Sequence, residues 1–291
     1  MRTVLERAGL VVAGLVVLVL VAGLVASHVG AANIAETHDV PVARLALPSD
    51  SASLARGAHL AGIYGCRDCH GDDLAGRVMS EEGPMRVSAP NLTPAGVGRA
   101  YGPEDWDRAI RHGVGPAGTA LFVMPAGAYN RMSDTDAADL IAYLEALPPV
   151  EAEVPPMEYR WMGRVLAAGP LDLAGGVHPE PTPPSSPAPG ATVAYGEYVA
   201  EMMCAYCHGP GLVGAEPEQP GAPYVPDLAG AGQWTPTQFH QAMTTGVTPG
   251  GRRMDPEVMP WTATARMTHD EREGLRLYLA TLLAAREATE S

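Results

Sequence analysis

Two stretches decide the fold: Cys66-Arg67-Asp68-Cys69-His70-Gly71 and Cys204-Ala205-Tyr206-Cys207-His208-Gly209. They hold all four cysteines of the 291-residue chain, so none is left for a structural disulfide or a nucleophile. The pattern Cys-x-x-Cys-His predicts covalent haem attachment, because two thiols can add to the vinyl groups of a porphyrin while the next imidazole binds its iron. Each stretch therefore predicts one haem c held by Cys66, Cys69 and His70 or by Cys204, Cys207 and His208.

Two other chemistries use Cys-x-x-Cys pairs. A zinc site could combine both pairs, but each pair is followed at once by His, and the pairs lie 138 residues apart. A thioredoxin-like redox site needs a βαβ context, which neither pair shows. The sequence favours haem over both.

The chain around these motifs is duplicated, since residues 53–147 align with residues 193–283. Equivalent positions include Gly57 and Gly196, Leu74 and Leu212, Gly76 and Gly214, Pro90 and Pro226, Met124 and Met259, and Tyr143 and Tyr278. So many shared offsets indicate two copies of one domain.

Each copy is expected to be mainly helical. A short helix runs into the first Cys of the motif. A second begins at a Pro and ends at a Gly, over 103–113 and 236–246. A third follows a capping box, Ser133-x-x-Asp136 or Thr268-x-x-Glu271, and carries apolar residues at helical spacing. The fold class is therefore all-α.

The thirteen methionines provide candidates for the second axial ligand of each iron. Met124 and Met259 are preferred because both precede a Pro at equivalent places in the repeat. Thioether sulfur is also a usual ligand of haem iron. Met132 and Met267 are also equivalent, but they directly precede a helix cap and are interpreted as core. The other candidates, which lack a partner in the repeat, are Met254, His59, His112, His240 and His269.

Near the N-terminus, Arg2 and Arg7 precede a charge-free run, Ala8–Ser27. This run is long enough to cross a bilayer as a helix. The rival interpretation is a cleaved signal peptide with a site near Val29-Gly30-Ala31, although such apolar regions are usually shorter. Length favours a retained anchor. Either reading places everything after residue 28 outside the cytoplasm.

The expected organisation is a membrane anchor over 1–28, a tether over 29–50, a first domain over 51–148, a Pro-rich linker over 149–191 and a second domain over 192–287. Eleven prolines in 148–191 predict an extended, semi-rigid spacer. The formal net charge of −14 is spread along the exported part. It makes nucleic acid an unsuitable partner, because phosphate contacts need basic clusters.

With Cys-x-x-Cys-His-Gly, Pro-Asn-Leu or Pro-Asp-Leu, Met-Pro and a last helix ending in Tyr-Leu, the chain resembles class I cytochrome c domains twice over. The resemblance implies that the first and last helices cross at Gly57 with Tyr143 and at Gly196 with Tyr278. It also implies that the carbonyls of Pro90 and Pro226 accept the proton of the iron-binding His.

The tandem arrangement is similar to diheme cytochromes of respiratory chains. It is also similar to cytochrome subunits of membrane-bound alcohol and gluconate dehydrogenases, which usually carry three haems where this chain has two motifs. The implied function is electron transfer without catalysis, from a quinol-oxidising complex or a dehydrogenase to a terminal oxidase or reductase. Alternatives are a fixed subunit of an oxidase or dehydrogenase, and a diheme peroxidase or thiosulfate-oxidising enzyme.

Overall fold

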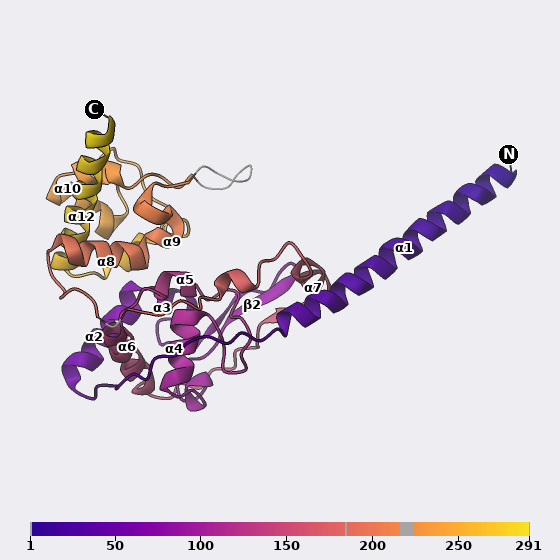
Figure 1. The fold of residues 1–291 in the computed structure, drawn as a ribbon, viewed down its shortest axis with the longest axis horizontal. Coiled ribbons are helices and arrows are strands. Elements are labelled where there is room, and N and C mark those ends of the chain that lie inside the picture. The colour runs from indigo at the N-terminus through magenta and orange to yellow at the C-terminus, as the bar shows by residue number, and fades with distance from the viewer. Residues whose placement is uncertain (1, 184, 216–223, 291) are drawn as a thin grey trace.

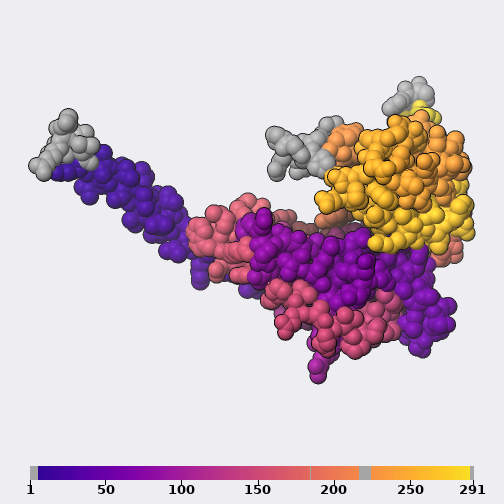
Figure 2. Space-filling view, turned by 180° about the vertical axis from the view of Figure 1, so that it is seen from behind, coloured from indigo at the N-terminus to yellow at the C-terminus, as the bar shows by residue number. Residues whose placement is uncertain are grey.

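The computed structural model describes residues 2–183, 185–215 and 224–290. A long helix, α1 (Arg2–Ile34), projects from a body made of two helical domains that lie against each other (Figures 1 and 2). The mostly helical fold expected from the sequence is confirmed.

The first domain contains α2 (Ser51–Ile63), α3 (Cys66–His70), the short 3₁₀ helix η1 (Val97–Arg99), α4 (Pro103–His112), α5 (Ala126–Tyr129) and α6 (Asp134–Glu145). It also has a small antiparallel sheet that the sequence analysis did not anticipate, of β1 (Arg77–Ser80), β2 (Met85–Ala89) and β3 (Glu158–Tyr159) in the order β1-β2-β3. Arg77 pairs with Ala89 and Met85 with Tyr159, so β3 is supplied by the segment that follows the domain.

The second domain repeats the helical part of this plan, and its described residues form no sheet. It contains α8 (Val193–Met203), α9 (Ala205–His208), η3 (Pro210–Leu212), η4 (Ala229–Gln233), α10 (Pro236–Thr245), α11 (Trp261–Ala265) and α12 (His269–Glu290). The Pro-to-Gly helices end as expected, because Gly113 and Gly246 adopt left-handed caps with φ of 68° and 70°. Two further elements, α7 (Trp161–Ala167) and η2 (Ala174–Gly176), lie between the domains in sequence.

In each domain the first and last helices cross so closely that only glycine fits. A Cβ placed on Gly57 would lie 2.1 Å from the Asp139 carbonyl oxygen and 2.7 Å from Cβ of Tyr143. On Gly196 it would lie 1.9 Å from the Gly274 carbonyl oxygen. The expected aromatic contact is therefore present at Gly57, whereas the nearest atoms at Gly196 belong to the backbone of Gly274 and Leu275.

The two segments expected to act as tether and linker both lie on the first domain. In the tether, the amide of Ala43 donates to Oδ2 of the buried Asp107 at 2.8 Å. In the linker, His112 Nδ1 donates to the His178 carbonyl at 2.6 Å, and the Pro183 carbonyl accepts the amide of Asp134 at 2.9 Å. Extended backbone offers unpaired carbonyls and amides, and here the domain satisfies them.

The interface between the domains has an approximate two-fold symmetry that follows the repeat. His59 on α2 bonds to Glu271 at the start of α12 at 2.8 Å, and the equivalent Tyr198 on α8 donates to Asp136 at the start of α6 at 2.9 Å. A second equivalent pair surrounds the first: Arg266 donates to the Gly62 carbonyl at 3.2 Å, and Arg131 lies 3.3 Å from Glu201. Each domain thus presents the same surface to the other.

Tyr198 also explains a difference between the two helix caps. Thr268 and Glu271 form both bonds of the expected capping box. The Ser133 hydroxyl accepts from the amide of Asp136, but the shorter Asp136 side chain makes no return bond to the Ser133 amide; that amide donates to the Tyr198 hydroxyl at 3.1 Å instead. The second domain therefore completes a helix cap of the first.

The Glu271 carboxylate gives this interface a pH dependence. Burial opposes its charged form, but hydrogen bonds from His59 and the Thr268 amide outweigh burial and hold the pKa of Glu271 below its ordinary value. A carboxyl whose pKa is lower in the folded chain than in the unfolded chain adds stability above the unfolded pKa of about 4.3. That contribution is lost as the pH falls through the folded-state value.

We expect Glu271→Gln to lower the free energy of unfolding at pH 7 by about 1.5–3 kcal/mol, the range for hydrogen bonds to charged groups. Gln still permits the capping box, so the loss reports the charge. Urea denaturation at pH 7 and pH 4 is the measurement, and the loss should shrink at pH 4. The control Thr264→Val removes a buried hydroxyl that donates to the Met243 and Trp261 carbonyls, which do not titrate, and should keep the parental pH profile. An unchanged profile in Glu271→Gln would contradict this assignment.

Candidate functional site

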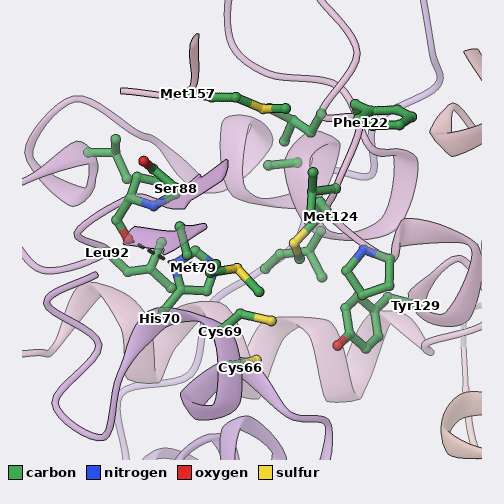
Figure 3. A pocket seen from close by; sticks show the side chains of 18 of the residues that line it. Cys66, Cys69, His70, Met79, Ser88, Leu92, Phe122, Met124, Tyr129 and Met157 are labelled. Carbon is green, nitrogen blue, oxygen red and sulfur yellow. Dashed lines mark hydrogen bonds between the residues drawn. The ribbon is translucent and has the colours of Figure 1, made fainter. Parts of the chain in front are cut away.

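A cavity of about 400 Å³ opens inside the first domain, and the haem-motif side chains lie along one side of it. Cys66, Cys69 and His70 approach it from α3, and Met124 approaches it from the opposite wall (Figure 3). Most of the remaining wall is aliphatic or aromatic. The cavity therefore joins two segments that are more than fifty residues apart in sequence.

Local backbone geometry explains how α3 presents its three groups. Gly65 turns the chain with φ of 76° after α2 ends, and Gly71 ends the five-residue helix with φ of 84°. Helical spacing places residues three and four apart on one face, so Cys69 and His70 lie beside Cys66.

The imidazole of His70 is held by the hydrogen bond that the family resemblance implied: Nδ1 lies 2.8 Å from the Pro90 carbonyl oxygen. Burial lowers the pKa of His70, and the bond to Pro90 opposes that shift. The ring is therefore neutral at pH 7, with Nδ1 donating and Nε2 carrying the lone pair that a metal requires.

The loop that brings Pro90 to His70 depends on two unusual backbone positions. Leu74 is fully buried in the left-handed region at φ of 59°, and its carbonyl accepts the amide of Leu92 at 2.9 Å. Gly76, with φ of 81°, donates to the His70 carbonyl at 2.8 Å, and a Cβ there would lie 2.6 Å from the Pro90 carbonyl carbon.

The second domain repeats the histidine bond and the unusual loop backbone. His208 Nδ1 lies 2.8 Å from the Pro226 carbonyl oxygen, and burial lowers the pKa of this imidazole. Leu212 has φ of 58°, and a Cβ on Gly214 would lie 2.6 Å from the Pro226 carbonyl carbon. Such strain at a non-glycine residue persists only where the surroundings enforce it, and both copies keep it.

The four thiols do not meet at one zinc site. Burial raises the pKa of Cys66 and of Cys204 to about 12, and it also raises the pKa values of Cys69 and Cys207. The two pairs lie on α3 and α9 in different domains, so they do not form a four-thiolate zinc site together. In the described part of the chain no three His, Cys, Asp or Glu side chains group closely enough to hold a metal ion.

The cavity is lined by the expected Met124 and also by methionines that the sequence did not single out. Met124 lines the cavity as the sequence led us to expect, while Met132 does so from the core with no exposed surface. Met79 and Met157 also line it, and Figure 3 shows Met79 directed inward near His70. Sequence reasoning missed Met79, because nothing in the repeat sets it apart. In the second domain, Met259 is partly buried against the core.

The alternative histidine ligands are engaged elsewhere. His59 bonds Glu271 across the domain interface, and His112 bonds the His178 carbonyl. His240 and His269 stack on each other with ring centroids 4.4 Å apart. None of the four is among the residues that line the cavity.

Buried polar atoms around the cavity are a further reason why it suits a haem. Three buried polar atoms around it, Tyr64 Oη, Ser88 Oγ and Trp106 Nε1, have no hydrogen-bond partner within the described part of the chain. Buried donors without partners are costly. A haem carries two carboxylates and so offers acceptors to such donors, inside an otherwise apolar wall.

The close approach at Gly76 can be tested directly. We expect Gly76→Ala to push Pro90 away from His70 and to destabilise the first domain by about 3 kcal/mol or more, from backbone strain plus overpacking. Gly83→Ala is the matched control, since Gly83 has φ of 76° but open space around it. Thermal unfolding of both variants is the measurement. Equal losses would show that the close approach to Pro90 is unimportant.

Two tandem helical domains, each with a Cys-x-x-Cys-His helix and an imidazole held by a proline carbonyl, define a protein of the cytochrome c class. The family model described as cytochrome c oxidase, cbb3-type, subunit III matches residues 52–144 and 191–279. The chain belongs to this family, which implies covalently bound haem c and a role in electron transfer.

Several characterised proteins are similar to the chain. A diheme cytochrome c-type of Cereibacter sphaeroides is 26% identical over 77% of this chain and 84% of its own length. The fructose dehydrogenase cytochrome subunit of Gluconobacter japonicus is 28% identical over 70% of this chain and 47% of its own length. The gluconate 2-dehydrogenase cytochrome c subunit of Pantoea cypripedii is 31% identical over 56% of this chain and 39% of its own length. The chain thus spans about half or less of the length of these two dehydrogenase subunits.

Proposed function

We propose that this chain carries electrons through two covalently bound haem c groups. His70 and Met124 would bind one iron, and His208 and Met259 the other. The observation that carries the proposal is the cavity in the first domain, which gathers both thiols, the oriented imidazole and the Met124 side chain around one apolar space. When bound, haem supplies one-electron chemistry between ferric and ferrous iron.

The protein's own groups would prepare the site for that chemistry. The Pro90 and Pro226 carbonyls fix the tautomer and direction of each imidazole. The aliphatic and aromatic walls exclude water and keep the local dielectric low, which tunes the potential. If Met124 and Met259 bind the irons as proposed, no position would remain for a peroxide, so a carrier is favoured over a peroxidase.

We further propose that α1 is a retained membrane anchor, with Arg2 and Arg7 on the cytoplasmic side and both domains outside. Residues 6–34 have a mean hydropathy of 2.9 in their most apolar window, and that window is not buried by the rest of the chain. The end of α1 is also built into the fold. A Cβ on Gly30 would lie 1.7 Å from the Arg164 carbonyl oxygen, and Asn33 Nδ2 donates to the Ala167 carbonyl at 2.9 Å. Cleavage after Ala31 would remove the Gly30 contact and cut α1 within its pairing with α7, which argues against a signal peptide.

The proposed electron donor is a membrane-bound dehydrogenase or a quinol-oxidising complex, and the acceptor is a terminal oxidase or reductase. A fixed place in a dehydrogenase complex is the second candidate, supported by the names of three relatives: the fructose, alcohol and gluconate dehydrogenase cytochrome subunits. Copurification in mild detergent separates the two candidates, because only a fixed subunit would stay with its complex.

The covalent attachment is tested by the mass of the purified protein. We expect an addition of two haems and retention of colour after acid–acetone extraction. Cys66→Ala with Cys69→Ala should remove one haem, and Cys204→Ala with Cys207→Ala the other. The same spectrum reports whether residues 1–28 remain. A protein that lost all colour on extraction would overturn the proposal.

The axial ligands are tested by redox titration of Met124→His and Met259→His. Since Met raises the potential of haem iron relative to imidazole, each substitution should move a different component of the titration downward. Met79→Leu is the control that the cavity itself suggests, and it should leave both components in place. Movement with Met79→Leu but not with Met124→His would transfer the ligand role to Met79. Carbon monoxide binding by the reduced parent protein should be weak if both irons are six-coordinate.

A further inference from the structure

From the position of α7 beside α1, we propose that α7 makes a second membrane contact, in which Trp161 and Met162 at its N-terminal end enter the lipid. The proposal rests on α1 being the membrane anchor. Figure 1 shows α7 alongside the end of α1 nearest the body, and Figure 2 shows that region of the chain against the base of the long helix. The two helices make one of the most extensive helix pairings in the fold.

The depth of Trp161 is fixed by its contact with α1. A Cβ on Gly23 would lie 2.9 Å from Cζ2 of Trp161, so the indole rests on the backbone at Gly23. Gly23 belongs to the charge-free run that ends at Ser27. Four helical residues correspond to about 6 Å along the axis. Apolar groups at a membrane interface lie about 5–10 Å into the boundary between headgroups and acyl chains. With that boundary placed at Ser27, Trp161 would reach this depth.

The exposed side chains of α7 suit that boundary. Trp161 is 47% exposed and Met162 is 49% exposed, although both are large and apolar. On the opposite side, Gly163 is buried against the Pro84 carbonyl and joins the helix to the first domain. Arg164, three residues after Trp161 on the same helix, is also exposed. A Trp at the boundary with an Arg extending toward phosphate is the usual composition of a membrane-interface anchor.

The consequence is a fixed orientation of the first domain. With α1 and α7 both in the membrane and the segment 35–50 bound to the domain surface, the domain has two points of attachment and no free tether. Ile34, the last residue of α1, lines the cavity that holds His70. The proposed haem site of the first domain therefore lies next to the bilayer surface, and the second domain lies farther away.

The test uses the full-length protein with its haems, in nanodiscs of phosphatidylcholine doped with a phosphatidylcholine that carries a diazirine on its acyl chain. After irradiation, lipid adducts are located by mass spectrometry. We expect adducts on α1 and on residues 161–166. Adducts on α1 alone would overturn the role of α7 and leave the anchor intact. Adducts on neither helix would overturn the anchor as well.

A double variant isolates the side chains. Trp161→Glu with Met162→Glu should lower the adducts on residues 161–166 about tenfold while adducts on α1 stay at the parental level. Val258→Glu, a substitution at a 52% exposed apolar residue of the second domain, should change neither. The haem absorption spectrum verifies that each variant is folded. If the double variant kept its α7 adducts, the proposed contact through Trp161 and Met162 would be wrong.

Discussion

The bond between an imidazole and a proline carbonyl, 2.8 Å long in both domains, is the constraint on which the rest of each domain depends. Its donor sits at the end of a short helix and its acceptor eighteen or twenty residues later in the chain. To bring them together, the loop accepts a leucine in the left-handed region and a glycine packed onto the proline segment. Both departures from ordinary backbone occur at the same places in both copies. They are therefore part of how the site is built.

The duplication supplies the arrangement of the whole body as well as its two sites. Because the first and last helices of each copy carry equivalent residues, each copy offers its partner the same surface. The result is a pair of interlocking contacts, His59 with Glu271 and Tyr198 with Asp136. An interface of this kind holds the two domains that carry the proposed haem sites against each other.

The segments that precede and follow the first domain in sequence are both attached to it. Residues on both sides of that domain in sequence, which their composition marked as tether and linker, lie on its surface and contribute hydrogen bonds and a strand to it. The linker also supplies α7, which packs against α1. The first domain is thus joined closely to the proposed anchor, whereas the second is joined mainly to the first.

The sequence by itself determined whatever rests on local contacts. Cys-x-x-Cys-His places its groups on one helical turn, Pro and Gly mark the ends of α4 and α10, Thr268 and Glu271 cap α12, and the run Ala8–Ser27 forms a helix. These features need only neighbours within about four residues, and such neighbours are readable in a single sequence.

Only the tertiary structure decided the rest. Several features depend on residues that are far apart in sequence: the inward position of Met79, the β-sheet and the docking of the linker. The same is true of the donors Tyr64, Ser88 and Trp106, which have no partner among the described residues. Proline content predicted an extended spacer, but the segment forms β3, α7 and η2, and composition carries no information about the surface on which such a segment lies. The same holds for Trp161, whose place at Gly23 follows from how two distant helices meet.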